Sequence, residues 1–165
     1  MKKKKFIKLY DKYANDIFRF IYFKISSREK AQDLASEVFL RFWRLIKIKN
    51  QELRIKNKRA FLYKIARNLV IDYYRKKSSK EVPLKDEIAE ILPGKSDLQK
   101  SAEISSDIEQ MLKALKSIKH EYQEAVVLYY IDDMKIKEIS RILDKTENNV
   151  RVLVHRGLEA LRKKL

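Results

Sequence analysis

Apolar residues recur at three- and four-residue steps along most of the chain, which is the spacing of one face of an α-helix. They form stripes in residues 6–25, 31–46 and 61–73. Residues 47–58 have weak periodicity and predict a loop between the second and third stripes. No segment of useful length alternates with the two-residue period of a β-strand. The N-terminal part of the chain therefore predicts a bundle of three helices.

The C-terminal part shows the same periodicity in shorter pieces. Stripes in residues 111–115 and 125–129 precede two more, in residues 136–143 and 150–161. The break between the last two is Asp144-Lys145-Thr146. The aspartate tolerates the left-handed backbone of a tight turn, and the threonine is a good N-cap. A helix, a three-residue turn and a capped helix predict a helix-turn-helix.

Shorter signals locate helix starts. Residues 26–29 and 106–109 both read Ser-x-x-Glu, which is the capping-box pattern. In this pattern the serine side chain accepts from the backbone N–H of the glutamate, and the glutamate side chain accepts from the backbone N–H of the serine. Residues 2–5 are all lysine, and we expect them to form a frayed basic tail.

Charge divides the chain into modules. Its 39 Lys and Arg against 23 Asp and Glu give a formal charge of +16, and the excess lies mainly in residues 1–80. Residues 81–105 are acidic and contain both prolines, which predicts a linker. The predicted fold class is therefore all-α, with two small helical domains at 1–80 and 106–165 joined by a flexible acidic linker.

Composition excludes several classes of protein. The chain has no Cys, two Gly and two His, so disulfide frameworks, thiol nucleophiles, Cys-based zinc sites and glycine-rich phosphate loops are all excluded. We predict no cofactor, no metal and no catalytic residue. No apolar run approaches the ~18 residues of a membrane span, so we expect no membrane insertion and a cytoplasmic protein. The excess of cations points to a polyanionic partner.

Two helices carry candidate nucleic-acid contacts. The second helix of the helix-turn-helix would present polar side chains to a major groove, although a plain helical hairpin gives the same pattern. The third stripe interleaves cations with aromatic residues, which suits single-stranded DNA but also fits core aromatics flanked by solubilising charges. Asp33 and Glu37 share one face of the second stripe. They fit either a basic partner or simple surface pairing with Lys30 and Arg41, and the residues alone favour the second interpretation.

Five segments resemble the extracytoplasmic-function (ECF) group of bacterial sigma-seventy factors. Residues 28–43 and 60–75 resemble the second conserved region of that family. Residues 124–131, 136–143 and 149–156 resemble its fourth region. The resemblance covers nearly all of the chain except the linker, with the two regions in the family's order.

The resemblance implies partners and roles. The partners are core RNA polymerase, through the clamp coiled coil of its largest subunit and its β flap, and promoter DNA. The implied contacts with the polymerase are Asp33, Leu34, Ser36, Glu37, Leu40 and Arg41. Those that open and read the minus-ten element are Arg59, Tyr63, Lys64, Arg67, Asn68, Asp72, Tyr74, Arg75 and Lys76. Those that read the minus-thirty-five element as duplex are Lys145, Thr146, Asn148, Asn149, Arg151, Val152, His155 and Arg156.

Some positions depart from the family pattern. Ser36 stands where Gln is usual, and Val152 and Leu153 stand where polar or basic residues are frequent. The two apolar residues lead to a hypothesis of weak minus-thirty-five recognition, or of recruitment to DNA by another protein. The resemblance also suggests an anti-sigma factor as a partner. The alternatives are a dimeric stand-alone helix-turn-helix regulator and a basic helical protein that binds RNA or a membrane surface.

Overall fold

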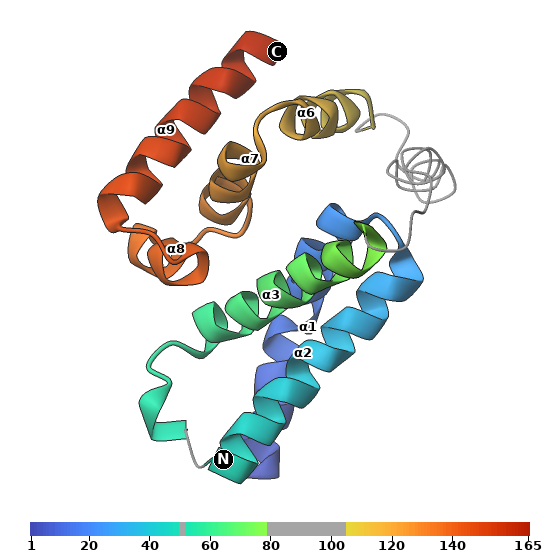
Figure 1. Ribbon diagram of the computed structural model, residues 1–165, viewed down its shortest axis with the longest axis vertical. Helices are drawn as coiled ribbons and strands as arrows, with labels where there is room; N and C mark the ends of the chain where they lie inside the picture. The colour runs from blue at the N-terminus through green and yellow to red at the C-terminus, as the bar shows by residue number, and fades with distance from the viewer. Residues whose placement is uncertain (50–51, 79–104) are drawn as a thin grey trace. The chain divides into compact units, whose positions relative to one another are not determined.

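The computed structural model describes residues 1–49, 52–78 and 105–165, which form two compact units (Figure 1). All regular structure in these ranges is helical, which confirms the predicted all-α class. The predicted linker, 81–105, lies outside the described residues except for Ser105, where a helix begins. Each unit is described by itself below.

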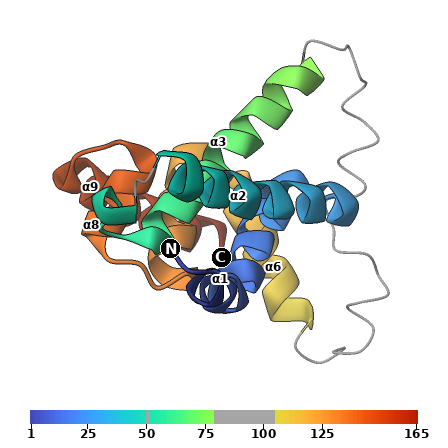
Figure 2. The ribbon, with the colours of Figure 1, turned by 90° about the horizontal axis from the view of Figure 1, so that it is seen from below.

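Over residues 1–49 and 52–78, the first unit is a three-helix bundle. It contains α1 (Lys3–Ile25), α2 (Arg28–Lys49), the 3₁₀ turn η1 (Glu52–Arg54) and α3 (Lys58–Ser78). Each of the three α-helices packs against the other two. Figure 2 shows the three helices from a second direction. The centre of the bundle is formed by fully buried side chains from all three helices: Ile17, Ile21, Val38, Phe42, Leu62 and Tyr63. Burying a side chain of this size stabilises a fold by about 1.5–3 kcal/mol, so the apolar stripes hold the helices together.

The helix ends differ from the prediction in three places. The helix α1 already begins at Lys3, so the basic start of the chain is helical rather than frayed. Ser26 ends α1 with a left-handed backbone, φ 64°. The N–H of Lys30 lies 3.5 Å from the hydroxyl of Ser27, so Ser27 rather than Ser26 caps α2, and the predicted capping box of Ser26 and Glu29 does not mark the start of the helix. At its other end α2 continues to Lys49, which shortens the predicted loop.

Over residues 105–165, the second unit contains five elements: α6 (Ser105–Ser117), α7 (His120–Val126), the π-helical turn η3 (Val127–Ile131), α8 (Ile136–Leu143) and α9 (Glu147–Lys164). The last helix, α9, packs mainly on α7 and α8. Leu128, Ile139, Ile142 and Val150 are fully buried between them. Because α6 starts at Ser105, Ser106 lies inside the helix, and the second predicted capping box does not mark its start.

The turn between α8 and α9 confirms the predicted helix-turn-helix. Asp144 adopts the left-handed conformation, φ 56°, and so ends α8. The N–H of Lys145 then donates to the carbonyl of Ser140 at 3.1 Å. The hydroxyl of Thr146 accepts a hydrogen bond from the N–H of Asn149 at 3.2 Å and caps α9.

Gly157 sets how closely α9 approaches α7. A Cβ atom at this position would lie 2.5 Å from Val126 Cγ2 and 3.1 Å from the carbonyl oxygen of Tyr122. Both distances are shorter than ordinary contacts. A mid-helix glycine costs about 1 kcal/mol relative to alanine, and here it allows two helices to pack in close contact.

Candidate nucleic-acid and partner interfaces

One face of α2 carries the six predicted polymerase contacts. Asp33, Ser36, Leu40 and Arg41 are exposed, and Leu34 and Glu37 are half-buried. Glu37 accepts a hydrogen bond from Arg41 at 2.8 Å, which is the surface pairing that the spacing predicts. Such exposed pairs contribute about 0–1 kcal/mol, so a partner can displace this one at little cost.

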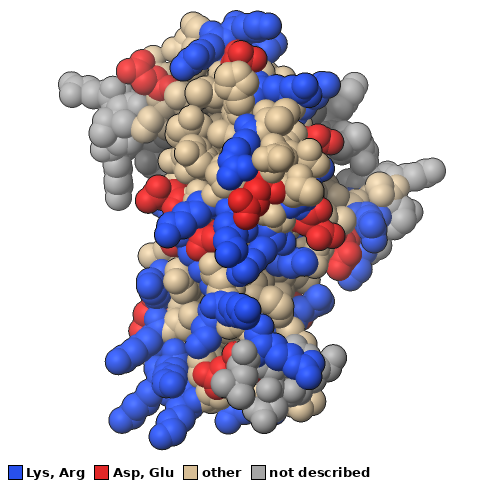
Figure 3. Space-filling view, turned by 90° about the vertical axis from the view of Figure 1, so that its left-hand side faces the viewer, with Lys and Arg blue, Asp and Glu red and all other residues tan. Residues whose placement is uncertain are grey.

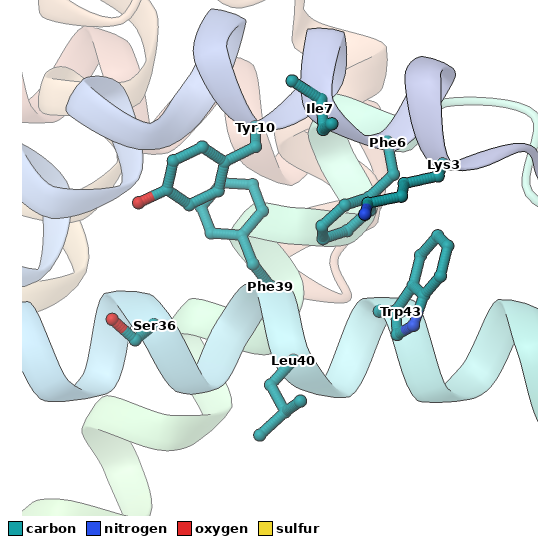
Figure 4. Close-up of a pocket in the computed structure, with 8 residues that line it drawn as sticks. All are labelled: Lys3, Phe6, Ile7, Tyr10, Ser36, Phe39, Leu40 and Trp43. Atoms are coloured by element: carbon teal, nitrogen blue, oxygen red, sulfur yellow. The ribbon is translucent and has the colours of Figure 1, made fainter.

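An apolar groove adjoins this face, between α1 and α2 (Figure 4). It has a volume of about 440 Å³. Two aromatic contacts between α1 and α2 form much of its wall: Phe6 on Trp43, with ring centroids 4.6 Å apart, and Tyr10 on Phe39 at 4.8 Å. Leu40 lines the groove and is 42% exposed. The charged face of α2 therefore continues into apolar surface.

Most of the predicted minus-ten contacts lie on the surface of α3. Arg59 and Arg67 are half-buried, and six others are exposed: Lys64, Asn68, Asp72, Tyr74, Arg75 and Lys76. Tyr63 is the exception, because its side chain is fully buried with its ring against Phe20 at a centroid distance of 5.1 Å. A ring within the core cannot stack on a base, so the assignment of Tyr63 to DNA contact does not fit the structure.

Two aromatic residues of α3 instead make structural contacts near the two ends of the helix. The guanidinium of Arg59 lies 6.0 Å from the centroid of the Tyr63 ring, so the buried ring supports a cation at the surface. Near the other end, the hydroxyl of Tyr74 donates to the backbone carbonyl of Lys24. Burial raises the pKa of Tyr74, and the neighbouring Tyr73 adds to the shift, so the hydroxyl stays protonated and able to donate. Tyr74 thus joins α3 to the end of α1 while its side chain stays partly exposed.

The predicted reading face of α9 is exposed to solvent. Asn148, Asn149, Arg151, Val152, His155 and Arg156 are all exposed, as is Thr146, and Lys145 is half-buried. Some of these side chains are held by neighbours on the same helix. Arg151 donates to Asn148 at 3.0 Å and lies 3.4 Å from Glu147, while His155 lies 3.3 Å from Glu159.

Val152 and Leu153, the two apolar residues of α9 that depart from the family pattern, have different environments. Val152 is 44% exposed, whereas Leu153 is only 9% exposed and belongs to the core. Leu153 therefore replaces no DNA contact, since its side chain points into the unit. The hypothesis of weak minus-thirty-five recognition then depends on Val152 alone.

Within residues 1–49, 52–78 and 105–165, no helix combines the length and the apolar character needed to cross a bilayer. The same ranges bring together no group of three side chains that could hold a metal ion.

Comparison with known proteins identifies the family of the chain. The model of Sigma-70 region 2 matches residues 9–80, and that of Sigma-70, region 4 matches residues 108–161. The ECF RNA polymerase sigma factor SigW of Bacillus subtilis is 33% identical, over 97% of this chain and 88% of its own length. The ECF RNA polymerase sigma factor BldN of Streptomyces coelicolor is 30% identical over 94% of this chain, which spans only 58% of BldN. The sigma factor RpoE of Bartonella quintana, solved with the anti-sigma factor NepR, has the same fold, with a TM-score of 0.72 and 18% identity over 98% of this chain and 96% of RpoE.

This all-α chain has an exposed helix-turn-helix and both sigma regions. It belongs to the sigma-70 family of RNA polymerase sigma factors. Its relatives place it in the ECF group of that family.

Sequence reasoning missed two features of these surfaces. One is the close packing at Gly157. The available signal was that a glycine interrupts a strong helical stripe. The other is a basic groove at the start of α1, which no local pattern indicates because its residues come from separate segments.

Proposed function

We propose that this ECF sigma factor binds core RNA polymerase and directs it to promoters. It would be a specificity subunit rather than a catalyst, acting in the bacterial cytoplasm where the polymerase is found. The observation that supports this most is the presence, in one chain, of regions two and four with their predicted contact residues mostly exposed.

The α2 face would grip the clamp coiled coil of the largest polymerase subunit. Asp33 and Glu37 supply negative charge on a chain of net charge +16, so they can select a basic partner. Leu40 adds apolar surface beside them. Charged groups around an apolar patch are typical of a specific protein interface.

The α3 face would open and hold the minus-ten element. Unstacking a base costs a few kcal/mol, which contacts to the flipped base and to phosphates must offset. Exposed Lys64, Arg75 and Lys76 can neutralise phosphates, and Asn68 can hydrogen-bond to a base edge. Tyr63 is not part of this proposed site.

The α9 face would read the minus-thirty-five element in the major groove. Arg151 and Arg156 can bond to guanine or phosphate, and Asn148 and Asn149 can pair with adenine. The contact between Arg151 and Glu147 must open when DNA binds. Each side chain is on the surface, so this rearrangement has a small cost.

Charge reversal on α2 tests the proposal. The variant D33K/E37K should lose co-elution with core polymerase on a sizing column, because like charges facing each other across an interface cost several kcal/mol. Its control is D11K/E121K, which reverses two other exposed carboxylates. Normal co-elution of D33K/E37K would refute the assigned face. Tight DNA binding by the unmodified protein alone, without a polymerase complex, would favour a stand-alone regulator.

A further inference from the structure

The exposed face of α9 carries one apolar side chain among polar ones. Val152 is 44% exposed. Its neighbours on the helix surface lie three and four residues away in the sequence, and all four are polar and exposed: Asn148, Asn149, His155 and Arg156. A single exposed valine on an ordinary surface needs no explanation. This valine lies in the middle of the predicted minus-thirty-five reading face, so its chemistry affects what that face can read.

The backbone that carries Val152 is firmly held at the start of α9. The carbonyl of Ser140 accepts from the N–H of Lys145 at 3.1 Å, and the hydroxyl of Ser140 donates to the carbonyl of Lys145 at 2.5 Å. Thr146 then caps the helix. Four residues after the cap, Val150 is fully buried. The side chain of Val152 therefore leaves a fixed backbone.

The valine side chain is also stiff in itself. Its branched β-carbon leaves one strongly preferred rotamer in a helix, so fixing it against DNA costs little conformational entropy. Two polar neighbours differ in this respect, since Arg151 lies 3.4 Å from Glu147. Similarly, His155 lies 3.3 Å from Glu159. Those contacts must open before the polar side chains reach DNA, whereas an aliphatic side chain has no hydrogen bond to give up.

The surroundings of Val152 favour a small apolar contact over a large one. Figure 3 shows Lys, Arg, Asp and Glu side chains intermixed about half-way up the visible face, the height at which Figure 1 places the turn between α8 and α9. A stable protein interface needs an apolar core within about 800 Å² per partner, which one isopropyl group among polar side chains does not supply. On the base edges of a major groove, the apolar group is the 5-methyl of thymine.

We propose that Val152 reads a thymine of the minus-thirty-five element through its 5-methyl group. This inference rests on the proposed sigma function and adds one base preference to it. An α-helix advances ~1.5 Å per residue, so Val152 lies about 6 Å along the axis from Asn148, which is less than two base-pair steps of ~3.4 Å. The thymine should therefore lie within about two base pairs of the base that Asn148 reads. The apolar departure from the family pattern then selects a base rather than weakening recognition.

The test uses holoenzyme assembled with the full chain. The unmodified holoenzyme selects a minus-thirty-five segment from promoter fragments in which that segment is randomised. Each thymine of the selected segment is then replaced in turn by uracil, which pairs as thymine does and lacks only the 5-methyl group. Binding of each fragment is measured with the unmodified protein, with V152A and with the control I108A, which shortens another exposed apolar side chain of the same unit.

One uracil substitution should weaken binding of the unmodified holoenzyme about fourfold, because burying one methyl group is worth ~0.8 kcal/mol and ~1.4 kcal/mol is a factor of ten. V152A should lose most of this sensitivity to uracil, whereas I108A should keep it. Alanine has a higher helix propensity than valine, so V152A should be at least as stable as the unmodified protein, and thermal unfolding checks this.

Sensitivity to uracil that persists in V152A would overturn the proposal and assign the preference to DNA shape. A selected segment without thymine, or one in which no uracil substitution has an effect, would overturn it as well. Failure to select any minus-thirty-five sequence would overturn it in favour of weak recognition, with binding through the minus-ten element retained. Absence of any holoenzyme with the unmodified protein would instead reject the proposed function itself.

Discussion

Replacement of Gly157 by alanine tests how α9 is positioned. On an exposed helix this change stabilises by about 1 kcal/mol, because alanine has the higher helix propensity. At position 157 the new methyl group would meet Val126 Cγ2 at 2.5 Å and the Tyr122 carbonyl at 3.1 Å. The two effects have opposite signs, so their magnitudes decide the outcome.

Neither neighbour can move aside easily. The Tyr122 oxygen is part of the backbone of α7, and Val126 is 4% exposed with a β-branched side chain that has one preferred rotamer in a helix. Extra methylenes in a packed core cost about 1–3 kcal/mol, and this site should lie near the upper end. After the propensity gain, we expect a net loss of about 1–2 kcal/mol. At ~4–8 °C per kcal/mol for a small domain, the melting temperature of this unit should fall by several degrees.

Thermal unfolding of the full chain, followed by circular dichroism, measures the loss. The matched variant is V126A, alone and combined with G157A, because removing the valine methyls relieves the closest contact. The double variant should lose less stability than the sum of the single variants, since contacting residues couple. If G157A is as stable as the unmodified protein or more stable, the reasoning on close helix packing is refuted.

Three further predictions follow from single contacts. T146A should lose about 1 kcal/mol in denaturant unfolding, because α9 loses its N-cap, whereas T146S should keep it. The raised pKa of Tyr74 means that its stabilising hydrogen bond to Lys24 is present below pH 10.0, the ordinary value, and is lost as pH rises through the folded pKa. Unfolding measured against alkaline pH should therefore show a loss that is absent in Y74F; identical profiles would contradict the role of the hydroxyl. R151A and R156A should each weaken holoenzyme binding by about 1–3 kcal/mol for every base that the arginine reads. This loss should be seen only on promoters that carry the minus-thirty-five element. Equal weakening on promoters without the element would indicate a phosphate contact instead.

Local signals in the sequence were sufficient to predict the main helices. The apolar stripes predicted α1, α2, α3, α8 and α9, since a helical period is visible within a few turns. The turn at Asp144 and the cap at Thr146 were predicted as well, because each depends on its own residue and its immediate neighbours. The displaced cap at Ser27 shows the limit of this reasoning, as two adjacent serines offer the same chemistry and only the backbone selects one.

Packing decided which of the predicted side chains can reach a partner. Tyr63 flanks the apolar stripe of α3, where periodicity alone leaves a residue between core and surface, and the approach of Phe20 from α1 buried it. Leu153 is buried in the same way, by packing within the second unit.

The sequence by itself determined the helical class, the helix-turn-helix and the family, because these follow from patterns within short segments. Tertiary structure decided the exposure of Tyr63 and Leu153, the need for glycine at 157 and the joining of α1 lysines with Lys56, Lys58 and Arg59 in one basic groove. Those features depend on distances between residues far apart along the chain. Such distances are set by how the helices pack, which no local pattern contains.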